Sequence, residues 1–143
     1  MKAAEICGWA AMFAGYHVKK SEVHGMAQRG GSVESHVRFG KKVFSPVVAA
    51  GTADVLVCFH PEEHDRLKAF LKADGVDLTA YLEKAQAAIA NPRHLNVFLV
   101  GVLSAHLPIE SDYWLKAIEA VFKKKYVEEN KAIFLKGREM GQL

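Results

Sequence analysis

The sequence DVLVCF at residues 54–59 is a continuous apolar run after its first residue. Such a run is typical of a β-strand that is covered on both faces. Pro61 follows, where it fits the first position of a helix, and Leu67, Phe70 and Leu71 then extend a helical pattern to about residue 73. A buried strand with a helix directly after it indicates a layered α/β fold.

Further strands are predicted upstream of this run. Residues 32–39 alternate, with Val33, Ser35, Val37 and Phe39 on one face and Ser32, Glu34, His36 and Arg38 on the other. This alternation predicts a half-buried strand. Residues 16–20 and 43–48 are also expected to be extended, and Pro46 marks an edge or an end of the second segment. The polar stretch 21–31 contains too many glycines for a packed element, and the strand order stays open.

Helices are predicted at both ends of the sequence. Residues 4–13 carry apolar side chains at helical spacing, and Gly15 supplies a stop. Downstream, after a linker near residues 74–75, helices are expected at 79–90, at 95–107, from a capping Ser111 to Phe122, and at 127–137. Together these patterns predict an α/β fold in which one layered domain, residues 1–143, holds a sheet flanked by helices.

The first helix has no sequence signal for its beginning. No Ser, Thr, Asp or Asn stands before Lys2 to cap it. The helix therefore reads as the continuation of a strand and turn that precede it, and a mis-assigned start codon or a truncated chain is the expected explanation.

Composition excludes several functional classes. Half of the 143 residues are hydrophobic and 24% are charged, which is ordinary for a globular domain. The net charge of +3 is too balanced to indicate nucleic-acid binding. Apolar stretches are shorter than the ~20 residues that a membrane helix needs, and no signal peptide is recognisable. We therefore expect a cytoplasmic protein with no membrane and no nucleic-acid partner.

The motifs that suggest metal binding are weak. Cys7 and Cys58 lie far apart in the sequence, and two thiols cannot by themselves ligate an iron–sulfur cluster, so no metal site is predicted. Both cysteines are expected to be small buried apolar residues. The sequence HPEEH at residues 60–64 matches a zinc pattern, but Pro61 favours the first helical position and moves His60 to the cap. Trp9 and Trp114 are core or subunit-contact residues, and the sequence leaves both alternatives open.

The most specific segment is SEVHGMAQRGGSV at residues 21–33. It brings together polar side chains that can each bond a partner, and glycines that allow close backbone approach. A solvated turn with a glycine bulge would explain this composition, and so would a docking or ligand-binding surface. The candidate interface or ligand-binding residues are Ser21, Glu22, His24, Gly25, Gln28, Arg29, Gly30 and Gly31.

This segment, together with SHVRFG at residues 35–40, resembles the gamma-type subunit of 2-oxoacid:ferredoxin oxidoreductases. Within that family it is most similar to the small (beta) subunit of indolepyruvate:ferredoxin oxidoreductase. The resemblance continues through residues 45–46, 53–59, 91–93, 96–97 and 129–134 and ends at Gly137, so it covers nearly the whole chain. It implies a fold like domain III of pyruvate:ferredoxin oxidoreductase.

The resemblance also implies a function. Family complexes oxidatively decarboxylate a 2-oxo acid to an acyl-CoA, with CoA as co-substrate, and pass the electrons to ferredoxin. Thiamine diphosphate and iron–sulfur clusters are expected in a large partner subunit, so this chain alone would bind no cofactor and carry no catalytic residue. The segment 21–31 would then meet the large subunit. The 2-oxo acid, of indolepyruvate or pyruvate type, stays open.

The sequence departs from the family at its beginning. Family members usually start with a strand and a G-x-G-G-Q-G turn before the first helix, and this sequence lacks both. One alternative function therefore remains at this point, a free-standing nucleotide- or CoA-binding α/β domain without a catalytic partner. The oligomeric state also stays open, including a homodimer of the isolated chain.

Overall fold

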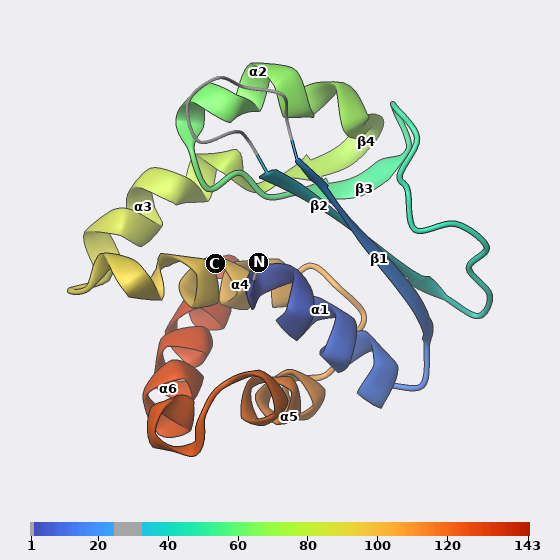
Figure 1. Cartoon of the computed structure of the whole chain (residues 1–143). Coiled ribbons are helices and arrows are strands. Elements are labelled where there is room, and N and C mark those ends of the chain that lie inside the picture. The colour runs from blue at the N-terminus through green and yellow to red at the C-terminus, as the bar shows by residue number, and fades with distance from the viewer. Residues whose placement is uncertain (1, 25–32) are drawn as a thin grey trace.

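The computed structural model describes residues 2–24 and 33–143. Figure 1 shows strands and short helices above a group of longer helices. The strands are β1 (His17–His24), β2 (Val33–Gly40), β3 (Ala53–Leu56) and β4 (Leu71–Asp77). The helices are α1 (Lys2–Phe13), α2 (His64–Leu67), α3 (Tyr81–Ala88), α4 (Leu95–Ser104), α5 (Ser111–Val121) and α6 (Lys124–Gly141). We call α1, α4, α5 and α6 the helical half, and the four strands with α2 the strand half.

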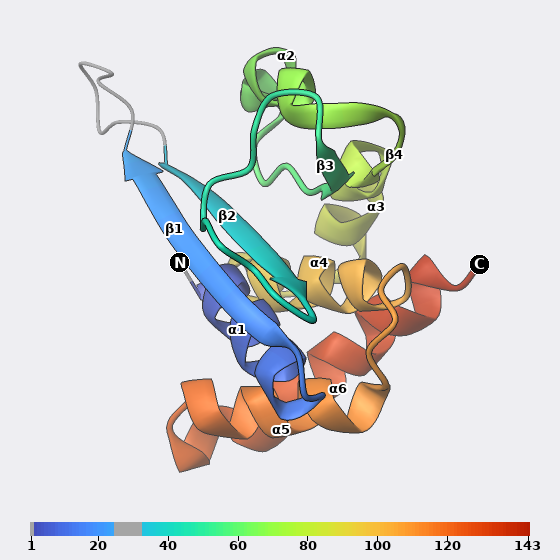
Figure 2. The same ribbon diagram turned by 90° about the vertical axis from the view of Figure 1, so that its right-hand side faces the viewer.

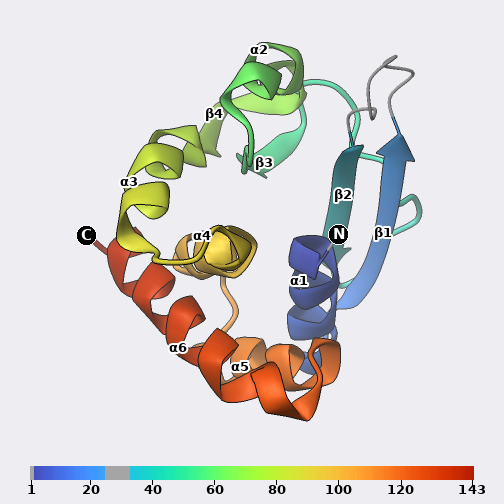
Figure 3. The ribbon, with the colours of Figure 1, turned by 60° about the vertical axis from the view of Figure 1, so that its left-hand side comes forward.

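The helical half forms around large apolar side chains that contact one another across four helices. Helix α5 repeats apolar residues at helical spacing, which places Trp114 and Ile118 on one buried face. Trp114 stacks on Phe134 of α6 with ring centroids 6.0 Å apart, and its Nε1 donates to the carbonyl oxygen of Ile109 at 3.1 Å. Ile6 of α1 completes this cluster, and the first helix packs mainly on α5, beside which Figure 3 shows it.

Helices α4 and α6 touch backbone to backbone. A Cβ atom at Gly101 would lie 2.2 Å from the carbonyl oxygen of Phe134, and one at Gly137 would lie 2.0 Å from that of Phe98. Only glycine therefore fits at either position. The same contact is fixed by Arg138, whose Nη1 donates to the buried Oγ of Ser104 at 3.0 Å.

The strand half consists of two separate pairs of strands. Strands β1 and β2 are antiparallel, in a register that runs from His17 opposite Gly40 to His24 opposite Val33. Strands β3 and β4 are parallel, with a bulge near Ala53. Figure 2 shows the long β1–β2 hairpin beside α1 and the shorter pair next to α2 and α3. No hydrogen-bonded ladder joins the two pairs among residues 2–24 and 33–143.

The predicted α/β class is confirmed, with small sheets flanked by helices. The helices expected near both ends are present, and Gly15 ends α1 with a φ of 93°, as a left-handed stop requires. Strand 32–39 is confirmed as β2 with a shift of one residue. The expected cap at Ser111 was wrong by one position, because Glu110 precedes the helix and Ser111 is its first residue.

Three predictions about the strands and the middle of the chain were wrong. Strand β1 extends to His24 into the stretch predicted to be unpacked, because the first glycine of that stretch is Gly25. Residues 43–48 form no strand. The helix expected over residues 61–73 is a series of short helical segments that end at Phe70. Strand β4 takes the place of the predicted linker, because pairing with β3 outweighs the weak strand propensity of residues 71–77.

Candidate functional site

A cavity of about 760 Å³ lies between the two pairs of strands. Its walls include the consecutive residues 34–39 of β2 and 52–57 around β3, and its floor includes residues of α1 and α4. The volume is within the range of small-molecule sites. The polar side chains that line it come mostly from β2 and from the turns around α2, so these elements hold the candidate site.

Two polar side chains of β2, Glu34 and His36, are part of the cavity lining. The alternation of the strand places Glu34 and His36 on the same face. The Nε2 atom of His36 lies 3.1 Å from Oε2 of Glu34, and the ring of Phe70 contacts the imidazole edge-on at 5.1 Å. His36 is buried although it was expected on the polar face of a half-buried strand, because Phe70 and the loop that contains Val48 cover this face.

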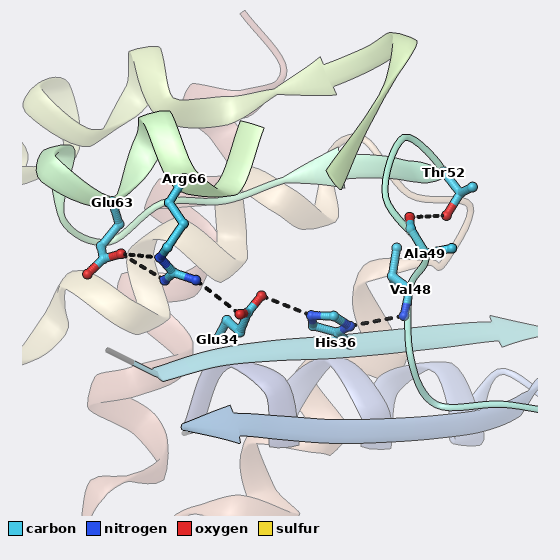
Figure 4. Close-up of polar contacts among 7 residues, drawn as sticks. All are labelled: Glu34, His36, Val48, Ala49, Thr52, Glu63 and Arg66. Carbon is cyan, nitrogen blue, oxygen red and sulfur yellow. Dashed lines mark hydrogen bonds and ion pairs between the residues drawn. The ribbon is translucent and has the colours of Figure 1, made fainter. Parts of the chain in front are cut away.

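The hydrogen bonds of His36 fix its tautomer. The backbone N–H of Val48 donates to Nδ1 of His36 at 3.0 Å, so Nδ1 carries no proton. The proton is therefore on Nε2, which donates to Glu34. Figure 4 shows this line of contacts from Val48 through His36 to Glu34. With both ring nitrogens engaged, His36 is a neutral bridge between β2 and the loop after it.

Arg66 of α2 connects the network to the opposite side of the cavity. Its Nη1 donates to Oε1 of Glu34 at 3.0 Å, and its Nε and Nη2 donate to Oε2 of Glu63 at 2.9 and 2.7 Å. The hydrogen bond that Arg66 donates to Glu63 is the main reason that the pKa of Arg66 is raised above its usual value. The guanidinium thus ties two acidic residues from different elements together (Figure 4).

This network positions elements rather than presenting free reactive groups. The Glu34 side chain is 14% exposed and accepts from His36 and from Arg66. We therefore read Glu34, His36, Glu63 and Arg66 as a bridge across the cavity, which we call the bridging network.

The structure places only part of the predicted site segment. Ser21, Glu22 and His24 belong to β1, where they lie opposite His36, Ser35 and Val33 of β2. Gly25, Gln28, Arg29, Gly30 and Gly31 are outside the described residues. The register of the β1–β2 pair ends with His24 opposite Val33.

A second polar cluster lies beside Cys58. The Nε2 atom of His64 is 2.6 Å from Oδ2 of Asp77, and Thr79 donates to Oδ1 of Asp77 through its backbone N–H at 3.0 Å. Burial alone would raise the pKa of Asp77, but the hydrogen bonds from Thr79 and His64 outweigh it and lower this pKa. His64 is therefore paired with Asp77. Pro61 lies in the first turn of the helical segment, as predicted, and His60 is at the cap.

The two cysteines do not form a reactive or metal-binding centre. Burial raises the pKa of Cys7 to about 12, and burial is also the main cause of the raised pKa of Cys58. Both thiols are free and buried, as expected. Within the described ranges no group of three or more His, Cys, Asp or Glu side chains could hold a metal ion. No helix in the same ranges is long and apolar enough to cross a membrane.

Comparison with protein families gives a match over nearly all of the chain. The family described as pyruvate ferredoxin/flavodoxin oxidoreductase matches residues 1–80 and 68–140. Two similar relatives are the indolepyruvate oxidoreductase subunits IorB of Thermococcus kodakarensis and Pyrococcus horikoshii. Each is 48% identical over 79 residues, which make up 55% of this chain and 39% of the relative. The matched segment thus spans about two fifths of the length of these relatives.

The fold also matches a solved structure. The gamma subunit of a keto/oxoacid ferredoxin oxidoreductase from Geobacter sulfurreducens PCA aligns with a TM-score of 0.77 and 21% identity. The alignment covers 97% of this chain and 89% of that chain. At this identity the likeness establishes the arrangement of helices and strands.

Proposed function

The chain belongs to the pyruvate ferredoxin/flavodoxin oxidoreductase family, and from this membership we propose that it is the small, gamma-type subunit of a 2-oxoacid:ferredoxin oxidoreductase. The observation that carries the proposal is the 48% identity with indolepyruvate oxidoreductase subunits. This identity favours an aryl pyruvate over pyruvate as the substrate. Every relative and structure reported above is an oxidoreductase subunit, so a free nucleotide- or CoA-binding domain is not proposed.

In the proposed complex the 2-oxo acid loses carbon dioxide and its acyl group is transferred to CoA. The reaction consumes a 2-oxo acid and CoA and yields an acyl-CoA, carbon dioxide, a proton and two electrons. Ferredoxin receives the electrons. We assign this chemistry to a large partner subunit in the cytoplasm, and we assign to this chain a structural and docking role within the complex.

The cofactors of the complex are assigned to the partner for a physical reason. An iron–sulfur cluster takes four ligands, commonly cysteine thiolates. Cys7 and Cys58 are buried thiols, and burial raises the pKa of both, which disfavours the thiolates that ligate iron. The described residues therefore do not fit a cluster. Thiamine diphosphate is placed in the partner because the family resemblance implies it.

The segment 21–31 is the proposed contact with the large subunit. Its described part, Ser21 to His24, lies in β1, and the register of the β1–β2 pair ends with His24 opposite Val33. Arg29 is the proposed partner of a carboxylate or phosphate, which a guanidinium can bind with two parallel hydrogen bonds. Glycines on either side of it permit close backbone approach.

Isolation of the protein from its natural source tests the proposed function. We expect a large subunit to copurify, and we expect the pair to reduce a viologen dye in the presence of indolepyruvate and CoA. The chain alone should reduce no dye. Isolation of a monomer without a partner, or dye reduction by the chain alone, would overturn the proposal.

Substitution of Arg29 tests the docking role. Arg29→Ala removes a charge-assisted pair at an interface, a loss that typically weakens binding by about 2–5 kcal/mol. Arg29→Lys should restore part of the affinity, because an ammonium group lacks the planar fork. Lys136→Ala, on the exposed surface of α6, is the matched control. Affinity for the large subunit is measured together with Tm. A lowered Tm with unchanged affinity would mean that Arg29 only supports the hairpin.

A further inference from the structure

The residues that follow β2 are held against the β1–β2 hairpin without forming a strand. We call residues 43–48 the strap. The backbone N–H of Val43, at its beginning, donates to Nδ1 of His17 at 3.0 Å. The backbone N–H of Val48, at its end, donates to Nδ1 of His36 at the same distance (Figure 4). Both ends of the strap are thus fixed to histidine side chains of the two paired strands.

The middle of the strap is fixed as well. Lys19 of β1 donates from Nζ to the carbonyl oxygen of Phe44 at 3.4 Å. Arg38 of β2 donates from Nη1 to the carbonyl oxygen of Ser45 at 2.9 Å. The Oγ atom of Ser45 accepts from the backbone N–H of Val47 at 3.2 Å. These bonds hold the strap in one backbone conformation, so a partner that binds it does not have to order its backbone first.

The strap exposes apolar side chains on its outer side. Val43 is buried, whereas Phe44 is 79% exposed and Val47 is 51% exposed. Among the aromatic residues of the described ranges, Phe44 is the most exposed. Neither Phe44 nor Val47 lines the cavity. Small molecules bind in concave sites, whereas a projecting aromatic side chain fits a pocket on another protein.

Positive charges surround these apolar side chains. Lys19 and Arg38 hold the strap from the hairpin, and the exposed Lys41 and Lys42 directly precede it. The Nζ atom of Lys42 lies 5.5 Å from the ring centroid of Phe44. Residues 35–53 contain no Asp or Glu. The surface around the strap therefore favours a partner that presents carboxylates.

The same charges disfavour a second copy of this chain as the partner. In a two-fold dimer the same residues of both copies face one another. Lys41 and Lys42 of one copy would then meet those of the other, and residues 35–53 supply no carboxylate to separate them. The charge around the strap thus indicates a different protein.

From these observations we propose that the strap is a second contact with the large partner subunit, in which Phe44 and Val47 enter an apolar pocket bordered by carboxylates. This inference rests on the proposed function, in which the chain works as part of a complex. Permanent interfaces are more apolar than transient ones. A phenylalanine that is exposed in the single chain is therefore covered by the partner that stays bound.

One partner can reach both the strap and segment 21–31. The register of the β1–β2 pair begins beside the strap, with His17 opposite Gly40, and ends with His24 opposite Val33. At about 3.4 Å per residue, the two ends of this register are about 24 Å apart. A standard interface, with about 800 Å² on each partner, is about 30 Å across. The large subunit can therefore cover both ends of the described hairpin in a single interface.

Binding of the purified large subunit to variants of this chain tests the proposal. The large subunit should bind Phe44→Ser at least tenfold more weakly, because its pocket loses the aromatic side chain that fills it. Tm should not fall, because the Phe44 side chain is mostly exposed. Tyr126→Ser is the matched control and should leave the affinity unchanged. Tyr126 is also an exposed aromatic residue with a lysine Nζ over its ring, but it lies in α6.

Charge reversal provides a second measurement, which keeps the proposal testable if Phe44→Ser does not fold. Lys41→Glu combined with Lys42→Glu should weaken binding at least tenfold at about 50 mM NaCl and much less at about 500 mM, because salt screens charges at the rim of an interface. The matched control combines Lys123→Glu with Lys124→Glu, at two exposed lysines where α6 begins.

The outcomes separate the strap from the proposed function. If the wild type binds the large subunit and the strap variants bind as well as their controls, the strap proposal is wrong and the proposed function stands. A lower Tm of Phe44→Ser with unchanged affinity would also overturn it, because Phe44 would then only support the fold. Failure of the wild type to bind the large subunit would overturn the proposed function, and the strap proposal with it.

Discussion

The helical half and the strand half of the molecule differ in how completely they are packed. In the helical half, α4 and α6 meet at Gly101 and Gly137 with no space for a methyl group. In the strand half, two pairs of strands stand on either side of a 760 Å³ cavity, and the bridging network joins β2 to α2 and the turn before it. The difference teaches that the helical half depends on close packing of its helices, whereas the strand half depends more on a few hydrogen bonds and ion pairs between side chains. The predictions below test this contrast, beginning with the largest effect.

Substitution of Gly137 should be the most damaging single change. In Gly137→Ala the new Cβ would lie 2.0 Å from the carbonyl oxygen of Phe98, so the two helices must separate. We expect a loss of about 3 kcal/mol or more in the free energy of unfolding, measured by urea denaturation.

Gly8→Ala is the matched control for this change. Gly8 lies inside α1, and a Cβ there meets side-chain atoms at 3.8 and 3.9 Å, which is ordinary contact. The alanine should therefore stabilise the protein by up to about 1 kcal/mol. If both alanines changed stability alike, the contact between α4 and α6 would not be as tight as described.

Loss of the bridging network should cost less and act on the strand half. Glu34→Gln removes the charge that holds Arg66 and His36, and we expect a loss of about 1–3 kcal/mol. Amide exchange in β2 should accelerate while exchange in α6 stays the same. Glu62→Gln, on the exposed turn next to Glu63, should change stability by less than about 0.5 kcal/mol. Equal effects of both substitutions would show that the network does not hold the strand half together.

Alkaline pH should destabilise the protein through Cys7. The folded thiol keeps its proton up to a pKa of about 12, whereas the unfolded thiol loses it near 9. Between these values the unfolded state binds fewer protons, so stability falls as pH rises, by at most about 1.4 kcal/mol per pH unit. The measurement is the free energy of unfolding from pH 8 to 10.5 for the wild type and Cys7→Ala. Parallel profiles would mean that water reaches the thiol through the cavity.

The smallest effect is expected at the caps of two short 3₁₀ helices, Leu78–Ala80 and Pro92–His94. Asp77 accepts from the backbone N–H of Thr79 at 3.0 Å, and Asn91 accepts from that of Arg93 at the same distance. Replacement of either residue by alanine should cost about 1 kcal/mol at pH 7.

The two caps should respond differently to acid. The pKa of Asp77 is lowered, so its contribution is complete above about pH 4 and is lost as pH falls through the folded pKa. The cost of Asp77→Ala should therefore shrink in acid, while that of Asn91→Ala should not. Identical pH profiles would show that the charge of Asp77 contributes nothing.

The sequence was a better guide to the helical half than to the strand half. Helices α5 and α6 have apolar residues at helical spacing, and α4 is a nearly continuous apolar run with small residues in it. These local patterns located the three helices within a few residues. Strand β4 was missed because residues 71–77 lack a strand pattern and owe their conformation to pairing with β3. Pairing with a distant strand leaves little trace in a short window of sequence.

The bridging network was also missed. The alternation in β2 correctly placed Glu34 and His36 on one face, but this face was read as the polar side of a half-buried strand. Burial of His36 depends on Phe70 and on the loop at Val48, which lie 34 and 12 residues away. The candidate residues of segment 21–31 came from its polar and glycine-rich composition together with the resemblance, and the described strands locate only the residues up to His24.

The packing of α1 on α5 has a consequence for synthesis of the protein. Ile6 of α1 and Trp114 of α5 share one core, so the face of α1 that packs on α5 stays uncovered until about a hundred more residues have been made. At about 5–20 residues per second the ribosome needs about 5–20 s for this. During that time the nascent chain exposes an apolar helix and a long hairpin. We therefore expect the ribosome-bound chain to be captured by chaperones until α5 emerges, which selective profiling of chaperone-bound ribosomes would show.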